Sequence, residues 1–369
     1  MFQETGSAGH SNLSFFTMID YTGLKFRGAI LRKIKKPLFI SSELTIPVLK
    51  RGQVLVKLAY SGICKSQLME IQGKRGEDKY LPHLLGHEGS GVVVAVGPGV
   101  KKVKPKNRIV LTWIKCKGID AGTPTFLDTS FGNINAGKVT TFNEFSVISE
   151  NRCVLLPANI PMDVGALLGC AVLTGFGIIV RELKPKQGSC IAIFGLGGIG
   201  MSALIACLSL SPAKLIAVDI NSKKLKLAKA LGATHCINAA NKNPVEEIKN
   251  LTLNAQGADY SVDCSGFAST IEQAFDSIKR GGKTVFASHP EAGQKISIDP
   301  FELINGKTLH GSWGGSSRPD IDIPLIGKLI KSKKIDLEKL ISKKYTIKNI
   351  NKAISDFHAG KVLRPLIKF

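Results

Sequence analysis

The sequence is short of disulfide-forming cysteines and of a hydrophobic leader. Its 369 residues contain 8 cysteines, scattered along the chain. That is too few for a disulfide scaffold and is typical of a reducing compartment. The first stretch, MFQETGSAGHSNLSFFTMIDYTG, has neither the basic start nor the apolar segment of a signal peptide. It predicts a polar extension over residues 1–24 and a cytoplasmic location.

Acidic residues are also scarce, with 28 Asp and Glu against 50 Lys and Arg, which gives a net charge of +22. A charge of this size is typical of proteins that bind nucleic acid. However, the basic residues are spread along the whole chain, Lys outnumbers Arg roughly four to one, and bidentate phosphate contacts favour Arg. We therefore expect a solvated basic surface that helps to attract anionic cofactors or substrates, and no nucleic-acid partner.

Charge is missing altogether from residues 187–213, a run long enough to span a bilayer. Within this run, GLGGIG follows the apolar strand CIAIF and precedes the helical MSALIACLSL. The glycines and the polar ending SLSPA favour a strand–turn–helix unit over a membrane span. We expect no membrane association.

The predicted pattern of secondary structure changes once along the sequence. Over residues 25–174, short β-rich runs such as GQVLVKLAY and GSGVVVAVG alternate with Gly and Pro, which predicts a compact β-barrel-like domain. Over residues 175–313, strands alternate with helices, as expected for a parallel sheet with helical crossovers. The sequence therefore predicts an α/β protein whose last segment, 314–369, packs back on the first domain.

The strand–turn–helix unit carries a nucleotide-binding pattern. Gly195, Gly197 and Gly200 form G-x-G-x-x-G in the required context, and Gly198 lies in the same turn. There the backbone approaches a pyrophosphate, which rests on the helix N-terminus. Asp219 ends the next strand, where it either caps a helix or accepts the adenosine ribose hydroxyls and repels a 2′-phosphate. Together with the glycines, it predicts NAD in preference to NADP.

A histidine and a glutamate stand side by side in YLPHLLGHEGSG, just before a valine-rich strand, where an unpaired charge is costly. His87 has two suitable partners elsewhere, Cys64 in SGICKSQ and Cys170 in GALLGCAVLTG. Two thiolates and an imidazole suit zinc and leave a fourth position open, as a catalytic zinc requires. By spacing alone, packing in a hydrophobic core remains the alternative.

Taken together, these segments resemble the medium-chain, zinc-dependent alcohol dehydrogenases. GHEGSGVVVAVGPGV has the spacing of that family's zinc-site signature, GIC-x-S and GC-x-V-x-TG match its other two ligand segments, and FGLGGIG, AVDIN, LGAT and VDCSG follow in family order. The similarity covers about residues 25–369 and is strongest to the branch of class III and aryl-alcohol dehydrogenases. It implies a GroES-like β-barrel catalytic domain (25–174) and a Rossmann, doubly wound NAD-binding domain (175–313).

The resemblance also implies roles for individual residues. Cys64, His87 and Cys170 are the implied zinc ligands, although polyol dehydrogenases of the superfamily generally use Glu at the third position. The other implied site residues are Glu88 beside the metal, Ser66 as the hydroxyl that takes the alcohol proton, Thr174 at the nicotinamide, Trp113 in the substrate pocket, Lys65 and Arg364 near the pyrophosphate, and Lys224 near the adenosine ribose.

Three departures from the family refine the prediction. Relatives with a structural zinc carry four close cysteines near residues 113–136, where only Cys116 is present, so we expect one zinc per chain. Met69 stands where several relatives have a proton-relay histidine, which leaves the proton to exit through ribose hydroxyls and water. Gln67 replaces an Asp that commonly hydrogen-bonds the ligand histidine. We expect its carbonyl to accept from the ring N–H of His87 without adding negative charge.

The sequence thus predicts a zinc- and NAD-dependent oxidoreductase that transfers hydride between an alcohol and its aldehyde, as a homo-oligomer (a dimer or tetramer). One alternative is a zinc-independent quinone or enone reductase of the same superfamily, against which the set of Cys64, His87 and Cys170 argues. Another is a basic binding protein that keeps the fold without catalysis. The substrate stays open between a small or aromatic primary alcohol and a carbohydrate or glutathione adduct.

Overall fold

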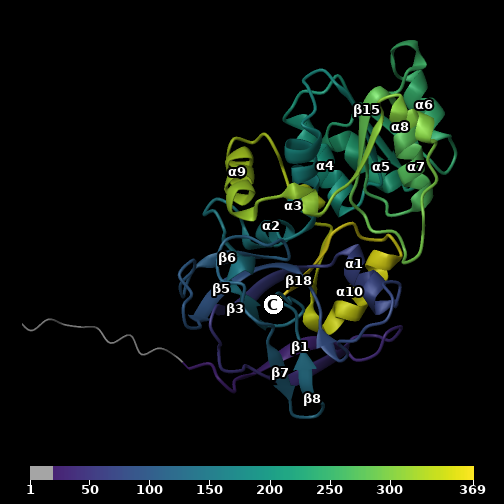
Figure 1. Cartoon of the computed structure of the whole chain (residues 1–369). Helices are drawn as coiled ribbons and strands as arrows, with labels where there is room; N and C mark the ends of the chain where they lie inside the picture. The colour runs from purple at the N-terminus through teal and green to yellow at the C-terminus, as the bar shows by residue number, and fades with distance from the viewer. Residues whose placement is uncertain (1–19) are drawn as a thin grey trace, which may run out of the picture.

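The computed structural model describes residues 20–369, so the predicted polar extension lies mostly outside the described residues. Figure 1 shows a helix-rich region at the top, with α4 to α8, and a strand-rich region below it that also holds the C-terminus. Helix α3 lies where the two regions meet. This arrangement agrees with the α/β fold expected from the sequence.

The strand-rich region contains two sheets. Five strands form a closed barrel in the order β1-β2-β7-β8-β4, and a second sheet has the order β10-β6-β5-β3-β18-β17, with β9 also pairing with β3. The strands are β1 (Lys25–Leu31), β2 (Phe39–Thr45), β3 (Gln53–Gly62), β4 (His83–Leu84), β5 (Glu88–Val96), β6 (Arg108–Thr112), β7 (Thr125–Asp128), β8 (Gly132–Asn135), β9 (Phe145–Ser149), β10 (Cys153–Leu155), β17 (Lys343–Thr346) and β18 (Pro365–Lys368).

Three short helices lie next to predicted ligands, the first directly after Cys64 and the other two on either side of Cys170. They are α1 (Lys65–Ile71), α2 (Met162–Leu167) and α3 (Ala171–Gly177). Helix α3 continues without a break into the π-helical turn η2 (Ile178–Leu183), which ends at Lys184 in the left-handed conformation. A domain boundary at residue 174 therefore falls inside a helix, because this helix is itself the connection between the two regions. We propose 25–174 and 175–313 as the two domains, joined by this continuous helix.

The helix-rich region is built on a six-stranded parallel sheet of order β13-β12-β11-β14-β15-β16. Its strands are β11 (Cys190–Phe194), β12 (Lys214–Asp219), β13 (His235–Asn238), β14 (Ala258–Asp263), β15 (Ile278–Phe286) and β16 (Thr308–Gly311), and its helices are α4 (Gly198–Leu208), α5 (Ser222–Leu231), α6 (Pro244–Asn250), α7 (Ala268–Asp276) and α8 (Pro300–Ile304). The strand order reverses around β11. In sheets of this kind, ligands bind beyond the carboxyl ends of the strands at that reversal.

The last part of the chain returns to the strand-rich region. Helix α9 (Pro319–Lys331) is held by the buried Asp322, which accepts from Arg181 Nε at 2.9 Å. Helix α10 (Ile350–His358) follows, and β18 pairs antiparallel with β3, with Leu366 opposite Gly62. The final strand therefore lies beside the strand that leads to Cys64.

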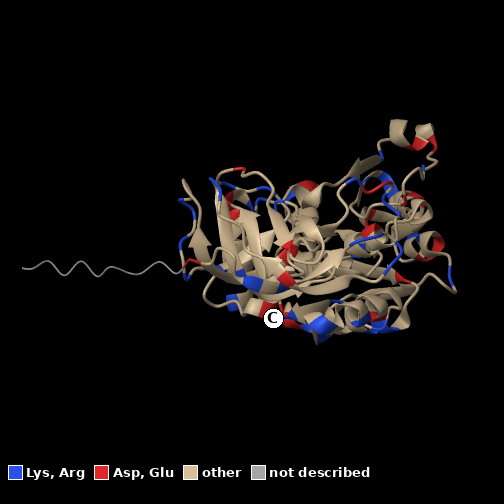
Figure 2. Ribbon diagram, turned by 90° about the horizontal axis from the view of Figure 1, so that it is seen from below, with Lys and Arg blue, Asp and Glu red and all other residues tan. Residues whose placement is uncertain are grey.

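The uncharged run at 187–213 folds as β11, the glycine turn and α4, and it ends just before β12. This is the expected strand–turn–helix unit. Within residues 20–369, no helix combines the length and the hydropathy needed to cross a membrane. Figure 2 shows Lys and Arg spread over many elements and interspersed with Asp and Glu. That distribution agrees with a solvated basic surface.

A glycine contact fixes how closely α3 approaches α4. A Cβ atom at Gly175 would lie 2.4 Å from the carbonyl oxygen of Ile199 and 2.6 Å from the backbone nitrogen of Ala203. Both neighbours are backbone atoms of α4, so they have no rotamer through which to move aside. The two helices pack at this distance because residue 175 has no side chain.

We therefore predict that Gly175→Ala forces α3 and α4 apart and lowers the free energy of unfolding by about 1–3 kcal/mol, as overpacked cores do. Urea denaturation followed by circular dichroism measures the change. Gly122→Ala is the matched control, because a Cβ atom there meets no atom within 4 Å and the backbone has no positive φ. Equal unfolding midpoints for the two variants would show that this contact does not limit the packing.

Candidate metal centre and cofactor turn

Three segments far apart in the sequence bring their metal-binding side chains together. Cys64 precedes α1, His87 precedes β5, and Cys170 precedes α3. One ligand atom from each lies within 4.8 Å of the others, and His87 Nε2 is 3.2 Å from Cys170 Sγ. Cys170 is buried, whereas Cys64 and His87 are partly exposed. The structure thus gathers the predicted ligand set and leaves one side of it accessible.

The electrostatics of the three groups suit a cation. The Cys170 thiol donates to Cys64, which lowers the pKa of Cys64 well below its ordinary value and raises that of Cys170 well above it. Burial alone lowers the pKa of His87, but the hydrogen bond and charge of Cys64 raise it above its usual value. The hydrogen bond from Cys170 and the charge of His87 thus favour the thiolate form of Cys64. A metal ion that replaces those protons has the ligand set that zinc prefers.

A second observation at the same place also fits a bound group. The hydroxyl of Ser66, in the first turn of α1, is buried and has no hydrogen-bond partner among the described residues. Buried polar atoms are normally paired. An oxygen bound near Cys64 would satisfy this hydroxyl. The residues present therefore fit a zinc ion with a ligand of its own.

Glu88 has a partner that the sequence did not reveal. Its fully buried carboxylate accepts a hydrogen bond from Arg364 Nη2, and its other oxygen, Oε2, has no partner among the described residues. Burial raises the pKa of Glu88, and the positive charge of Arg364 opposes the rise. A Cβ atom at Gly198 would lie 2.9 Å from Arg364 Cδ. Arg364 thus lies between the carboxylate beside the metal ligands and the start of α4.

Gln67 contacts His87, as expected, but through the other end of its amide. The amide nitrogen of Gln67 faces His87 Nδ1, and the carbonyl oxygen accepts from the backbone N–H of Cys64 at 2.9 Å. The expected acceptor, the carbonyl, is occupied because the first turn of α1 needs an acceptor for that N–H. The interpretation of Gln67 as an oxygen acceptor for His87 is therefore wrong for this arrangement, while its contact with the ring is correct.

Aromatic rings border the ligand set. The Trp113 ring centre is 6.4 Å from that of His87 and 5.2 Å from that of Trp313, which it meets edge to face. Trp313 follows the last strand of the parallel sheet and is 79% exposed, and no motif in the sequence marks it as a site residue. Thr174 is buried in α3, where its N–H donates to the carbonyl of Cys170 at 2.9 Å. The two indoles join the two regions of the molecule beside the ligands.

The predicted cofactor turn lies at the strand-order reversal. Gly195 has φ of +80°, and a Cβ atom at Gly200 would lie 2.0 Å from the Gly195 carbonyl oxygen. Asp219, at the end of β12, accepts from the backbone N–H of Leu196 at 2.7 Å. Lys224 Nζ lies 3.4 Å from the same carboxylate oxygen. The turn is therefore tight, and Asp219 is oriented by it. Position 197 is open, because no atom of residues 20–369 lies within 4 Å of a Cβ placed there.

Lys65 crosses from the strand-rich region to the loop after β14. Its ammonium donates to the carbonyl of Ser265 at 2.7 Å and lies 4.7 Å from the centre of the Phe267 ring. A Cβ atom at Gly195 would lie 2.7 Å from the backbone nitrogen of Ser265. Lys65 therefore reaches the loop that packs against the glycine turn. Partial desolvation of its ammonium lowers the pKa of Lys65.

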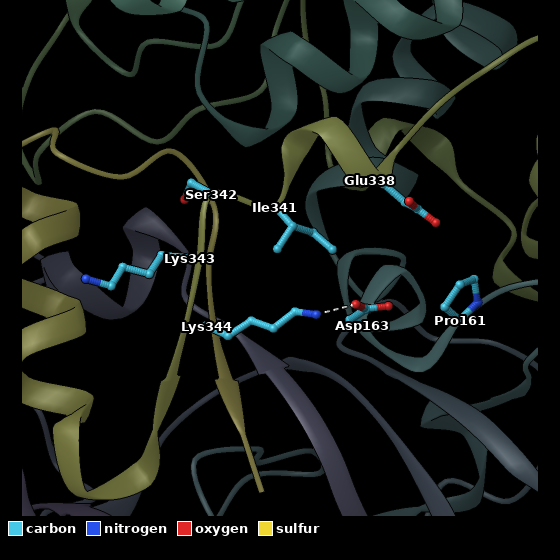
Figure 3. A pocket seen from close by; sticks show the side chains of 7 residues that line it. All are labelled: Pro161, Asp163, Glu338, Ile341, Ser342, Lys343 and Lys344. Carbon is cyan, nitrogen blue, oxygen red and sulfur yellow. Dashed lines mark hydrogen bonds and ion pairs between the residues drawn. The ribbon is translucent and has the colours of Figure 1, made fainter.

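A separate hollow of about 550 Å³ lies between the start of α2, the strand β17 and the residues just before β17 (Figure 3). Lys344 Nζ donates to Asp163 there at 2.6 Å. Its lining residues are Pro161, Asp163, Glu338, Ile341, Ser342, Lys343 and Lys344, and none belongs to the predicted site.

Comparison with known proteins agrees with this geometry. Residues 50–158 match the alcohol dehydrogenase GroES-like domain, and residues 198–331 match the zinc-binding dehydrogenase domain. The chain is 31% identical to an S-(hydroxymethyl)glutathione dehydrogenase of Paracoccus denitrificans, over 94% of this chain and 100% of that one.

Solved structures show the same similarity over nearly the whole chain. Benzyl alcohol dehydrogenase from Acinetobacter calcoaceticus is 30% identical with a TM-score of 0.84, covering 94% of this chain and 99% of that one. An alcohol dehydrogenase zinc-binding domain protein from Burkholderia ambifaria is 29% identical with a TM-score of 0.87, covering 93% and 98%. The chain therefore belongs to the medium-chain, zinc-dependent alcohol dehydrogenase family and is an oxidoreductase of alcohols and aldehydes that uses zinc and a nicotinamide cofactor.

Proposed function

We propose that the protein is an NAD-dependent dehydrogenase of aromatic primary alcohols, with one catalytic zinc held by Cys64, His87 and Cys170. The convergence of these three side chains next to Trp113 carries the proposal. Trp113 and Trp313 offer two perpendicular indole faces, which suit a flat apolar substrate because aromatic pairs gain about 0.5–1.5 kcal/mol beyond the burial of area. The name of the benzyl alcohol dehydrogenase relative points in the same direction.

The residues around the ligands have different roles in the proposed reaction. Zinc bound there would supply a Lewis acid that makes an alcohol more acidic. The hydroxyl of Ser66, buried and without a partner among the described residues, is placed to accept the alcohol proton. Met69 offers no base for the next transfer, so the proton passes to water. Thr174 contacts the nicotinamide of the bound cofactor, and Trp113 packs against the ring of the substrate and orients it.

Glu88, Arg364 and Lys65 prepare the space between the metal and the cofactor. Arg364 neutralises Glu88 and lies against Gly198 at the start of α4, where a pyrophosphate binds. Lys65 adds a second cation from α1. These contacts support the assignment of both basic residues to the pyrophosphate.

The proposal extends to location and assembly. All eight cysteines are free thiols, which fits the cytoplasm. Strand β16 is the edge of the parallel sheet, and the nearby Phe301 and Ile304 expose 64% and 82% of their surface. An open strand edge beside exposed apolar side chains favours association, so we propose a homodimer or a tetramer.

The test of function is oxidation of benzyl alcohol and ethanol with NAD, followed by the absorbance of the reduced nicotinamide. We expect kcat/KM to favour benzyl alcohol by at least about tenfold, equivalent to about 1.4 kcal/mol, and about one zinc per chain after dialysis. Cys170→Ala should abolish turnover and leave NADH affinity within about twofold, because the cofactor turn lies on other elements. Turnover without a zinc ligand would contradict the proposal.

For the coenzyme, we predict that NAD is preferred over NADP by at least about tenfold, since a hydrogen bond to a charged group contributes about 1.5–3 kcal/mol. Asp219→Ala should shrink this ratio, because it removes the carboxylate and releases Lys224 to meet a 2′-phosphate. Steady-state kinetics with both coenzymes give the ratio. Asp276→Ala, an exposed carboxylate at the end of α7, is the control. Equal use of the two coenzymes by the unmodified enzyme would refute the role of Asp219.

For Gln67, we predict that Gln67→Glu lets carboxylate oxygens accept from both Cys64 N–H and the His87 ring. Zinc should then be held about 10–100-fold more tightly. The added negative charge should raise the apparent pKa for alcohol oxidation, because it disfavours the deprotonated alcohol. Chelator competition and a pH–rate profile measure the two effects. Gln72→Glu, at the end of the same helix, adds the same charge away from His87. If both variants behave alike, Gln67 does not tune the metal.

A further inference from the structure

We infer a second metal-ion site, separate from the Cys64, His87 and Cys170 set, that is formed by Glu70, Asp78 and His83 and binds a divalent first-row transition-metal ion. Glu70 lies in the last turn of α1, Asp78 in the loop that follows, and His83 in β4. One ligand atom from each of the three lies within 4.8 Å of the others.

The spacing of the inward atoms suits an ion. His83 Nε2 is 2.8 Å from Asp78 Oδ2 and 3.8 Å from Glu70 Oε1. Ligands about 2.1 Å from a tetrahedral ion lie roughly 3.4 Å from one another, a value between the two distances. Small side-chain rotations would therefore bring all three atoms into a coordination shell.

Each of these residues is oriented by its other polar atom. His83 Nδ1 lies 3.0 Å from the carbonyl oxygen of Leu84, Asp78 Oδ1 accepts from the N–H of Tyr80 at 3.0 Å, and Glu70 Oε2 is 3.6 Å from Arg75 Nη1. The outward contacts leave Nε2, Oδ2 and Oε1 within 4.8 Å of one another. Metal ligands are commonly held in this way, with the second ring nitrogen of a histidine bonded to a backbone carbonyl.

The donor set selects the kind of ion. One imidazole and two carboxylates bind Zn²⁺, Co²⁺ or Mn²⁺, and two negative charges balance the charge of a divalent ion. Burial raises the pKa of Glu70, and the neighbouring Asp78 adds to the rise although His83 and Arg75 oppose it. The His83 side chain is 9% exposed and that of Glu70 27% exposed, so water can reach the ion from one side.

The contact with the Leu84 carbonyl sets which ring nitrogen of His83 faces the ion. Because Nδ1–H donates to that carbonyl at 3.0 Å, Nε2 is the atom that can act as a ligand. Ligands give up their protons when a metal ion binds. Ion binding should therefore weaken as the pH falls. A bound ion would tie the loop between α1 and β4 to the helix that also carries Gln67.

The test uses protein dialysed to one zinc per chain, so that the thiolate site is filled and the carboxylate site is free. The probe is Mn²⁺, which favours oxygen-rich sites and leaves a thiolate-bound zinc in place. The loss of the free Mn²⁺ signal in electron paramagnetic resonance gives stoichiometry and affinity, and zinc analysis afterwards checks that the thiolate site is still filled. We expect one Mn²⁺ per chain. Asp78→Asn and Glu70→Gln should each weaken binding by at least about tenfold, and lowering the pH should weaken it in the parent.

Glu291→Gln is the matched control, because Glu291 pairs with Lys74 of the same loop at 2.6 Å and lies outside the cluster. It should bind Mn²⁺ as the parent does. The proposal is overturned if the parent shows no saturable binding. It is also overturned if Asp78→Asn and Glu70→Gln bind like the parent, or if Glu291→Gln loses as much affinity as they do, since the effect would then be one of net charge.

Discussion

The buried ion pair between Glu88 and Arg364 is the contact on which the arrangement of the site depends. Glu88 begins β5 directly after His87, which we propose as a ligand, and Arg364 precedes the last strand of the chain. Removing one partner of such a pair leaves an uncompensated buried charge, at a cost of about 3–5 kcal/mol. The pair therefore fixes the chain end against the proposed metal ligands, and it presents the guanidinium to the start of α4. This contact therefore fixes the position of the proposed metal site relative to the proposed cofactor turn.

Local patterns predicted much of the site. The glycine turn, Asp219 at the end of its strand and the three ligand segments are short stretches whose chemistry is visible without the fold. Contacts between distant segments were not visible in this way. Glu88 and Arg364 are separated by 276 residues, and nothing local to either names the other. Trp313 likewise became part of the site only because β16 ends opposite Trp113.

Gln67 shows why a correct contact can carry an incorrect hydrogen bond. Family resemblance placed its amide at His87, but the sequence does not state which end of the amide the helix uses. The N–H of Cys64 needs an acceptor, and the Gln67 oxygen supplies it. The need to pair a backbone N–H at the start of a short helix thus decides which atom of the Gln67 amide faces His87. The proposed domain limit at residue 174 lies inside a helix for a related reason, because a pattern of strands and helices does not show that one helix serves both regions.

That shared helix has a mechanical consequence. Helix α3 starts next to the ligand Cys170 and runs through Gly175, packed on α4, into η2 without a break. The helical run ends at Lys184, whose φ of 48° lies in the left-handed region. Its other end lies beside Cys170, and Gly175 within it packs against backbone atoms of α4. A displacement of the cofactor turn at the start of α4 would therefore be passed along this helix to the Cys170 sulfur, which we propose as a metal ligand.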